Sequence, residues 1–471
     1  MPKTKIICTM GPSTDNPEII EEMVKAGMNV ARLNFSHGSH EEQLGRINMV
    51  KQVREKLKCP LAILLDTKGP EIRIGTFAGG AAILEKGQKF TLVTDEIDGD
   101  NEKVSVTHKN LVGVLKTGDT ILIDDGLIEL EVSELSGKDV VCTVINGGRL
   151  SNKKSINLPG IKLDMPYMTD KDREDLIFGI KQDVDYVAAS FVRNADDAKC
   201  VRELLDENGG EEIKLIAKIE NNEGVENIDE ILKISNGIMI ARGDMGVEIS
   251  FERLPAIQKS LIKKCHEAGK PVITATQMLE SMVHNPRPTR AEVSDVANAI
   301  YDGTSAIMLS GETAAGQYPV ESVKTMAKIA EMTEKNIHYK KRFQAQQKIK
   351  NTSVTDAVSH AACTMAMDLE AAAIVTVTTT GHTARMLSKF RPACPIIAVI
   401  VDIKSYHQAA MTWGVTPVKN DMHENMDDVF ESGVRKAITT RMLKKDDVIV
   451  LTGGLPVGIS GTTNVVKVQI L

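Results

Sequence analysis

The chain has 471 residues, 42% hydrophobic but only 3% aromatic, so its length allows roughly two to four domains with aliphatic cores. Its net charge of −7 argues against general nucleic-acid binding, although a local cationic pocket is compatible with it. The seven cysteines form no C-x-x-C pair, and no apolar run reaches the roughly 18 residues of a membrane span. With no cleavable leader evident, we expect a cytoplasmic protein without membrane or nucleic-acid partners.

Short aliphatic runs alternate with helix-length segments, which predicts a parallel sheet buried on both faces. Eight such strands favour a (β/α)8 barrel, and an open doubly wound sheet is the alternative on strand pattern alone. The runs are KIICTM, MNVARLNF, LAILLDT, VDYVAASF, IKLIAKIE, GIMIARGD, PVITATQ and SAIMLSGE. We expect this α/β barrel to be the catalytic domain and to occupy residues 1–69 and 167–345.

The connection after the third run is far longer than a usual barrel loop. Within residues 70–166, the segments KFTLVT, KVSVTH, TILIDDGLIELEVSEL and DVVCTVI alternate in polarity and turn at Gly and Asp. This pattern is typical of antiparallel strands and predicts an inserted small β-barrel. We expect it to sit above the strand ends as a lid that excludes water.

The pattern restarts in the last part of the chain. A capped helix and the strands in AAAIVTVTTT, CPIIAVIVD, DDVIVLTGG and NVVKVQIL predict a separate α/β domain over residues 346–471. The segment KKRFQAQQKIKN is expected to be the linker.

Polar side chains gather where the predicted barrel strands end, which is where such barrels carry their functional groups. Lys218 and Glu220 lie two positions apart and so point to the same side. Asp244 ends the neighbouring strand, so its carboxylate and that of Glu220 can converge on a Mg²⁺ ion. Arg32 and Arg73 offer bidentate contacts to phosphate oxygens. Together they indicate a site for phosphoryl transfer or for an enolate.

Each feature alone also has a simpler interpretation. Lys218 and Glu220 could form an ordinary ion pair, and Arg242 could pair with Asp244 or Glu248. The threonines of TATQ could be strand formers that bond to the backbone. Several such features on successive strand ends favour the functional interpretation.

Nine segments in chain order closely resemble pyruvate kinases of the bacterial type without an extra C-terminal domain. They are MNVARLNFSHG, LLDTKGPEIR, INLPG, IAKIENNEG, MIARGDMGVE, ITATQMLESM, NPRPTRAEVSDVANAI, DGTSAIMLSGETAAGQYPVE and TTTGHTARMLSKFRP. The resemblance implies phosphoryl transfer from phosphoenolpyruvate to ADP, giving pyruvate and ATP in the final step of glycolysis. It also implies Mg²⁺ (or Mn²⁺) and K⁺ as cofactors and a homotetramer.

Carried over position by position, the resemblance makes Glu220 and Asp244 the Mg²⁺ ligands. Lys218 matches the lysine that stabilises the transferring phosphoryl group and the enolate. The substrate-binding and further catalytic positions that it implies are Arg32, Gly243, Asp244 and Thr276. Whether Thr276 or a water relay protonates the enolate stays open at this point.

The resemblance also supplies nucleotide and K⁺ positions. The implied nucleotide contacts are Asn34, Phe35, Ser36, His37, Arg73 and Lys154. The implied K⁺ ligands are Asn34, Ser36, Asp66 and Thr67, all of which offer hard oxygen atoms. Glu71 supports K⁺ dependence, because members independent of K⁺ tend to carry lysine there.

The C-terminal domain carries TTTGHT, which matches the turn where the family binds an effector's phosphate. The turn comprises Thr378, Thr379, Thr380, Gly381, His382 and Thr383, just before a predicted helix whose N-terminus favours anions. A sugar phosphate is the expected effector, although the last loop, GGLPVGISGTT, lacks the Trp and Arg of some eukaryotic relatives. A simple helix-capping turn is the alternative.

Two rival functions are compatible with parts of this pattern. A Mg²⁺-dependent lyase or aldolase of the phosphoenolpyruvate/pyruvate barrel type would also stabilise an enolate but would need no nucleotide. A non-catalytic sugar-phosphate sensor would use only the C-terminal domain. The inserted domain and the intact strand-end residues argue against both.

Overall fold

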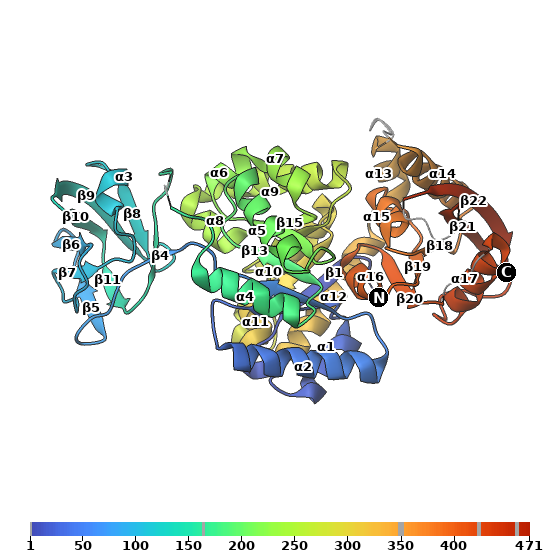
Figure 1. Cartoon of the computed structure of the whole chain (residues 1–471), viewed down its shortest axis with the longest axis horizontal. Helices are drawn as coiled ribbons and strands as arrows, with labels where there is room; N and C mark the ends of the chain where they lie inside the picture. The colour runs from blue at the N-terminus through green and yellow to red at the C-terminus, as the bar shows by residue number, and fades with distance from the viewer. Residues whose placement is uncertain (1, 163–164, 347–352, 422–424, 457–460) are drawn as a thin grey trace.

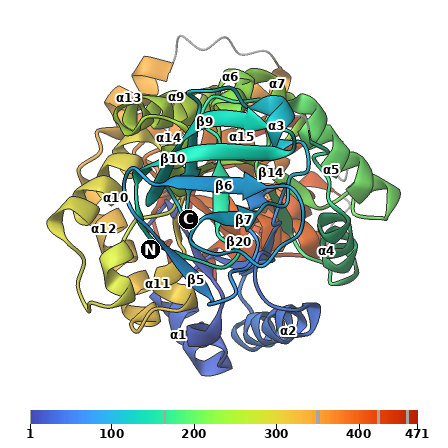
Figure 2. The ribbon, with the colours of Figure 1, turned by 90° about the vertical axis from the view of Figure 1, so that its left-hand side faces the viewer.

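The computed structural model describes residues 2–162, 165–346, 353–421, 425–456 and 461–471. The chain forms three parts in a row: an inserted β domain, a central barrel and a C-terminal domain (Figure 1). Seen along the long axis, the inserted domain lies directly in front of the barrel (Figure 2). Within the described residues, no helix is long and apolar enough to cross a membrane.

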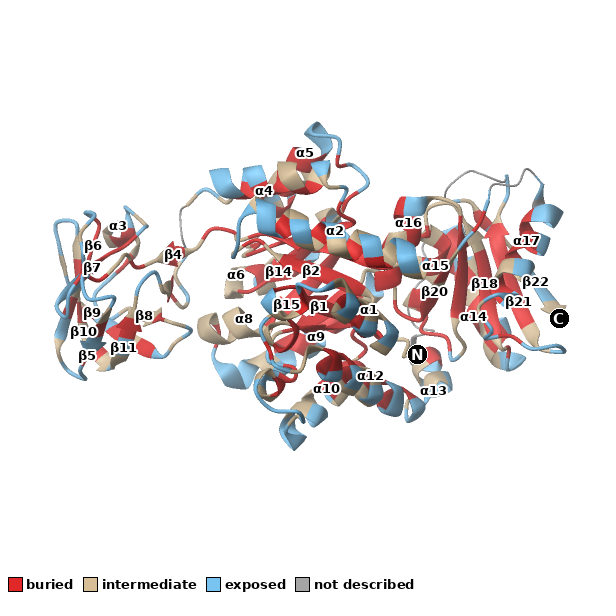
Figure 3. Ribbon diagram, turned by 90° about the horizontal axis from the view of Figure 1, so that it is seen from below, coloured by how far each residue is buried: buried red, intermediate tan, exposed pale blue. Residues whose placement is uncertain are grey.

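The central part is a closed barrel of eight parallel strands, in the order β1-β17-β16-β15-β14-β13-β3-β2. The eight aliphatic runs of the sequence supply these strands, so the predicted barrel is confirmed and the open sheet is not found. Their residues are almost all buried, as expected of strands covered on both faces (Figure 3). The strands are β1 (Lys5–Thr9), β2 (Val30–Asn34), β3 (Ala62–Asp66), β13 (Tyr186–Ala189), β14 (Lys214–Ile219), β15 (Gly237–Ala241), β16 (Val272–Ala275) and β17 (Ala306–Leu309).

Helices surround the barrel, and local sequence fixes where several of them begin. Capping boxes join Ser39 to Glu42 and Thr289 to Glu292, which satisfies free backbone N–H groups at the starts of α2 and α10. The helices are α1 (Pro17–Ala26), α2 (His40–Leu57), α4 (Asp170–Lys181), α5 (Ala195–Glu207), α6 (Asn222–Glu226), α7 (Ile228–Ile234), α8 (Arg242–Glu248), α9 (Leu254–Glu267), α10 (Arg290–Asp302), α11 (Gly311–Ala314) and α12 (Pro319–Lys335).

The inserted domain has a hydrophobic core of its own and a seven-stranded sheet in the order β4-β12-β8-β9-β10-β6-β7. An antiparallel bridge between Ile74 and Val106 joins the two ends of this sheet, so the strands curl around their core. The predicted antiparallel pairing holds except for β6 and β7, which pair in parallel. The elements are β4 (Ile72–Arg73), β5 (Ala81–Leu84), β6 (Lys89–Val93), β7 (Lys103–Ser105), α3 (Leu111–Val114), β8 (Thr120–Ile123), β9 (Ile128–Ser136), β10 (Asp139–Asn146), β11 (Gly148–Ser151) and β12 (Ser155–Asn157).

The C-terminal domain is a five-stranded sheet in the order β20-β19-β18-β21-β22, in which only β22 is antiparallel to its neighbour. The expected linker is partly wrong, because α13 (Tyr339–Gln346) takes up its first half; residues 347–351 lie outside the described residues. The elements are α14 (Val354–Asp368), β18 (Ala373–Thr378), α15 (His382–Lys389), β19 (Ile396–Ile400), α16 (Ile403–Gln408), β20 (Val415–Lys419), α17 (Met426–Ile438), β21 (Val448–Gly454) and β22 (Thr463–Ile470).

The two ends of the barrel have different neighbours. The C-terminal strand ends face the inserted domain, and the N-terminal ends face the C-terminal domain (Figure 1). At the N-terminal ends, Lys5 Nζ donates to the Val415 carbonyl at 2.7 Å and the Tyr186 hydroxyl to the Gln408 carbonyl at 2.6 Å. Because functional groups of such barrels gather at the C-terminal ends, the expected site lies beneath the inserted domain.

Candidate active site

A buried lysine stands at the centre of the C-terminal strand ends. Lys218 Nζ lies 3.0 Å from Glu220 Oε1 and 3.1 Å from Asp66 Oδ1. It also donates a hydrogen bond to Ser190 Oγ at 2.7 Å. These side chains come from β14, β3 and the end of β13, which are neighbours in the barrel. The closed sheet therefore brings together groups that are more than 150 positions apart in the sequence.

The charges of this cluster depend on one another. Burial opposes the charged form of Lys218, but the attraction of Asp66 and Glu220 outweighs it and raises the pKa of the amine. Burial likewise opposes the charge on Asp66, yet Arg32 and Lys218 lower its pKa. For Glu220, burial wins over the attraction of Lys218 and raises the pKa to about 8. Ionising the Glu220 carboxyl group is unfavourable even beside the Lys218 cation. A further positive charge, such as a bound metal ion, would stabilise its ionised form.

The Glu220 carboxylate has an oxygen to offer to such a charge. Its Oε2 accepts a hydrogen bond from the Phe191 N–H at 2.5 Å, whereas Oε1 is buried and has only the ion pair with Lys218, without hydrogen-bond geometry. Asp244, on α8, is near enough to raise the pKa of Glu220 further. In the described ranges, no three His, Cys, Asp or Glu side chains form a group that could hold a metal ion, and the predicted ligands remain the two carboxylates of Glu220 and Asp244. That donor set fits Mg²⁺, which usually keeps substrate or water oxygens in its remaining positions.

The predicted K⁺ ligands lie together at the ends of β2 and β3. Asn34 and Asp66 are direct partners in the strand pairing, and Thr67 follows Asp66. Arg32 holds the buried Asp66 through an Nε–Oδ2 contact of 2.6 Å and donates to the Thr9 hydroxyl at 2.9 Å. The oxygen-only donor set fits an alkali cation, and Arg32 lies within the same cluster.

Thr276 and Gly243 also meet as expected. The Gly243 N–H donates to Thr276 Oγ1 at 2.7 Å, and that hydroxyl donates to the Ala275 carbonyl at 2.6 Å. Thr276 has a φ of 66°, a strained conformation for a β-branched residue, and such strain clusters at functional sites. The simpler interpretation, in which Arg242 pairs with Asp244 or Glu248, is not found in the described residues, because Arg242 contacts Asp295 at 2.7 Å.

A cavity of about 510 Å³ opens between the barrel and the inserted domain. His37, Arg73, Lys154 and Asp244 all line it. Arg73 contacts Glu71 at 2.7 Å and Lys154 contacts Asp124 at 2.7 Å, so both cations are held near the cavity by single carboxylates. The cavity thus places Asp244, a predicted Mg²⁺ ligand, in the same space as Arg73 and Lys154 of the inserted domain.

Phe35 requires a correction. Its ring is fully buried and packs near Phe178, with 5.9 Å between ring centroids. Its N–H donates to the Asp66 carbonyl, and its own carbonyl accepts from Lys171. Phe35, the first residue after β2, therefore has its side chain in the hydrophobic core and both its backbone N–H and its carbonyl engaged, which disfavours a direct contact with a nucleotide.

Comparison with known proteins identifies the family. The family model "Pyruvate kinase, barrel domain" matches residues 1–323, and "Pyruvate kinase, alpha/beta domain" matches residues 356–469. The chain belongs to the pyruvate kinase family. It is 53% identical to the pyruvate kinase of Clostridium acetobutylicum, with both chains covered completely. It is 49% and 50% identical to those of Sporosarcina psychrophila and Staphylococcus epidermidis, covering the whole of this chain and 81% of each relative.

This result confirms the predicted resemblance and the enzyme class, a phosphotransferase of the glycolytic family. Family membership does not favour the two rival functions, a Mg²⁺-dependent lyase or aldolase and a non-catalytic sugar-phosphate sensor. Members of the pyruvate kinase family use Mg²⁺ and K⁺, which agrees with the two oxygen-rich clusters described above.

The turn that is predicted to bind an effector's phosphate, residues 378–383, directly joins β18 to α15. Thr378 ends β18, and Gly381, with a φ of 68°, is the residue before α15. The Thr383 and Thr463 hydroxyls lie 2.6 Å apart, so part of the turn is tied to the start of β22. Residues 457–460 of the last loop lie outside the described residues.

Ser190 and Asp125 are functional candidates that the sequence reasoning missed. Ser190 is buried against Lys218, and its hydroxyl also donates to the Thr67 carbonyl at 2.6 Å. Asp125 lines the cavity, and burial followed by repulsion from Asp244 raises its pKa. Ser190 could have been found, because it directly follows the aliphatic run VDYVAA, as the other site residues follow theirs.

Proposed function

We propose that the chain transfers the phosphoryl group of phosphoenolpyruvate to ADP, giving pyruvate and ATP, with Mg²⁺ and K⁺. The observation that carries this proposal is the buried Lys218 between Asp66, Glu220 and Ser190. The charge of Asp244, which lines the cavity beneath the inserted domain, also acts on Lys218. Family membership sets the reaction class, and the cluster supports assigning the chemistry to these residues.

Lys218 acts as a fixed positive charge. In the reaction, the bond between the enol oxygen and phosphorus breaks, and a terminal oxygen of ADP forms the new bond to phosphorus. Negative charge spreads over the transferring group and remains on the enolate oxygen. The raised pKa keeps Lys218 protonated throughout, and Arg32 adds a second cation from β2. Cations held in place before the reaction stabilise this charge without reorganisation.

Glu220 and Asp244 would hold Mg²⁺, which when bound supplies charge neutralisation and Lewis acidity to the phosphoryl oxygens. Asn34, Ser36, Asp66 and Thr67 would hold K⁺. We assign the substrate carboxylate to Thr276 and the backbone of Gly243 and Asp244. The Thr276 hydroxyl already donates to the Ala275 carbonyl, which favours a water relay as the source of the proton that converts enolate to pyruvate.

Arg73 and Lys154 are assigned to the nucleotide phosphates, and His37 lines the same cavity from the barrel side. Asn34 and Ser36 are assigned to the nucleotide as well. Both cations are paired with carboxylates at 2.7 Å, which orients them before the nucleotide arrives. Polyanionic donor and acceptor would repel one another without these charges.

The direct test measures pyruvate formation with ADP, Mg²⁺ and K⁺ omitted in turn, for wild type and Lys218→Met. We expect product only with all three additions and a loss of at least about 10³-fold in the variant. Lys404→Met is the matched control, because Lys404 is equally buried, at 8% exposure, but lies at the opposite end of the barrel. Turnover without ADP would support the lyase instead, and no turnover under any condition would support the sensor.

The domain roles, the assembly state, the cellular location and the effector belong to the same proposal. We propose the division into a catalytic barrel (1–69 and 167–345), a lid (70–166) and an effector domain (346–471). The lid role is supported by a contact between the inserted domain and the barrel: the Asn157 side-chain N–H donates to Glu248 Oε1 at 3.1 Å. A homotetramer, a cytoplasmic location and a sugar-phosphate effector at residues 378–383 complete the proposal.

A further inference from the structure

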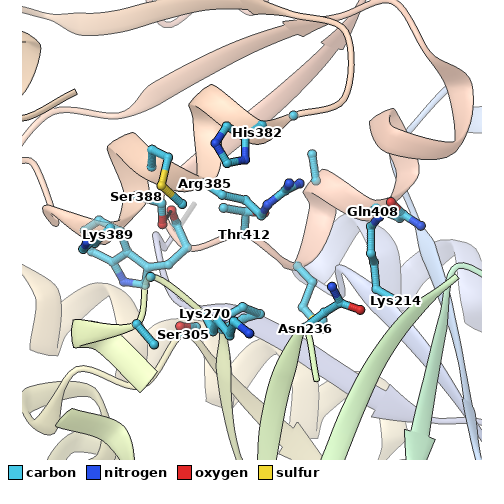
Figure 4. Close-up of a pocket in the computed structure, with 18 of the residues that line it drawn as sticks. Lys214, Asn236, Lys270, Ser305, His382, Arg385, Ser388, Lys389, Gln408 and Thr412 are labelled. Atoms are coloured by element: carbon cyan, nitrogen blue, oxygen red, sulfur yellow. Dashed lines mark hydrogen bonds between the residues drawn. The ribbon is translucent and has the colours of Figure 1, made fainter. Parts of the chain in front are cut away.

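A second cavity, of about 240 Å³, lies at the opposite end of the barrel from the active site, against the C-terminal domain (Figure 4). Lys214, Asn236 and Lys270 line it from the barrel side, just where β14, β15 and β16 begin. His382 and Arg385 of α15 line it from the C-terminal domain. Its volume falls below the roughly 300–1,000 Å³ that holds drug-sized ligands, so it suits a small metabolite.

The lining of this cavity is strongly cationic. It contains five lysines and arginines, and among the described residues that line it there is no Asp or Glu. Burial lowers the pKa of Lys214, and the nearby Arg385 lowers it further. Burial also lowers the pKa of Arg385. Like charges held together away from water are unfavourable until an anion compensates them.

Among the described residues, four of these five cations have no carboxylate partner: Lys389 pairs with Asp356, and Lys270 donates only to backbone carbonyls. No hydrogen bond or ion pair engages Lys214 Nζ within the part of the chain that the structure describes. Arg385 donates only to the Thr380 carbonyl, at 3.2 Å. Arg391 is 96% buried, and its Nη2 donates to the Gly303 carbonyl and to Ser305 Oγ, both at 3.0 Å. Its Nε has no acceptor, and its guanidinium stacks 4.4 Å from the Trp413 ring centre. Buried donors without acceptors are rare, and Arg391 Nε is one that lines this cavity, beside the half-buried charges of Lys214 and Arg385.

Polar neutral groups complete the lining. The Asn236 side-chain oxygen accepts from the Leu215 N–H at 2.8 Å, which leaves its amide N–H groups for a ligand. Burial lowers the pKa of His382, so this imidazole is neutral at pH 7 and can accept a hydrogen bond as well as donate one. Thr412 lies on the same wall (Figure 4).

We propose that this cavity binds the phosphate group of a small phosphorylated metabolite, with Lys214 and Arg385 as its main charge partners. Asn236, His382 and Thr412 would contact the rest of the molecule. The cavity shares Gly381 and His382 with the predicted effector turn but opens toward the barrel, whereas Thr383 of that turn contacts Thr463 at the start of β22. A ligand here contacts two domains at once, so it stabilises their arrangement.

The cavity carries its own reporter, because Trp413 is the only tryptophan in the chain and lines this space. The experiment titrates the full-length protein with inorganic phosphate, or with glycerol 3-phosphate, and follows Trp413 fluorescence and the melting temperature. We expect a saturable fluorescence change and a rise in melting temperature, with the ester binding more tightly than inorganic phosphate. In Lys214→Gln and in Arg385→Gln, the apparent Kd should rise about tenfold or more.

Matched variants separate this site from the other two anion sites. Thr383→Val in the effector turn and Lys218→Met in the active site should leave the Trp413 response intact. Arg385→Lys, which keeps the charge, should recover part of the affinity that Arg385→Gln loses. The proposal is overturned if neither readout responds, or if the response survives both charge removals, or if it disappears in Thr383→Val.

Discussion

Replacing Ser190 with alanine removes one hydroxyl from the active site, and we expect it to slow turnover about 10- to 100-fold. Ser190 Oγ accepts from Lys218 Nζ at 2.7 Å and donates to the Thr67 carbonyl at 2.6 Å, so it fixes the amine between Asp66 and Glu220. A hydrogen bond to a charged group contributes about 1.5–3 kcal/mol, and about 1.4 kcal/mol is a factor of ten in rate.

The assay is steady-state kinetics with phosphoenolpyruvate and ADP across pH. Because Ser190 positions Lys218 rather than binding substrate, kcat should fall while KM for phosphoenolpyruvate stays nearly constant. The alkaline limb of the kcat profile should move to lower pH, since the protonated amine loses an acceptor.

Ser322→Ala is the control, because Ser322 is equally buried and donates to the Tyr318 carbonyl at 2.8 Å within α12. It should leave both kcat and the pH profile unchanged. An equal loss of kcat in both variants, or a loss confined to KM, would refute the positioning role of Ser190.

Three further substitutions test other parts of the proposal. Glu71→Lys places an ammonium group near the K⁺ site and should abolish the K⁺ requirement of turnover; an unchanged requirement would contradict the assignment. Lys154→Gln leaves Asp124 without its cation, and should raise KM for ADP about tenfold with little change in KM for phosphoenolpyruvate. Burial raises the pKa of Asp185 to about 6, so its protonated form is favoured in the folded state and stability should fall as pH rises through about 4 to 6. In Asp185→Asn, the free energy of unfolding, measured at several pH values, should lose this dependence on pH, which amounts to at most about 3 kcal/mol. If the free energy of unfolding of Asp185→Asn falls with pH as steeply as that of the wild type, Asp185 does not cause the dependence.

The barrel could be predicted from sequence because each strand is a continuous aliphatic run with a polar residue at its end. Lys218, Glu220 and Asp66 were found in this way, since the parallel arrangement puts all such ends on one face. Asp244 was expected to end a strand, and it instead lies in the helix α8 that follows the strand directly. The strand pattern thus predicted the position of Asp244 correctly to within one turn of the helix that follows the strand.

Other features depend on contacts that no local pattern contains. The partner of Arg242 is Asp295, 53 positions away on α10, and the nearer acids are not used. Phe35 was a predicted site residue by resemblance, but its side chain packs in the core near Phe178 directly after β2. The cavity around Lys214 and Arg385 exists only because two separately folded domains meet there.

The pairing of β4 with β12 also bears on how the barrel can close. β3 and β13 are neighbours in the barrel, although Leu64 and Tyr186 lie about 120 positions apart. Ile72 and Ile156, near the entrance and exit of the inserted domain, pair directly. Once that domain has folded, the chain between β3 and β13 behaves as a loop of roughly 40 residues, which lowers the entropic cost of closure by ~1 kcal/mol. An early-folding insertion would therefore speed assembly of the barrel that it interrupts.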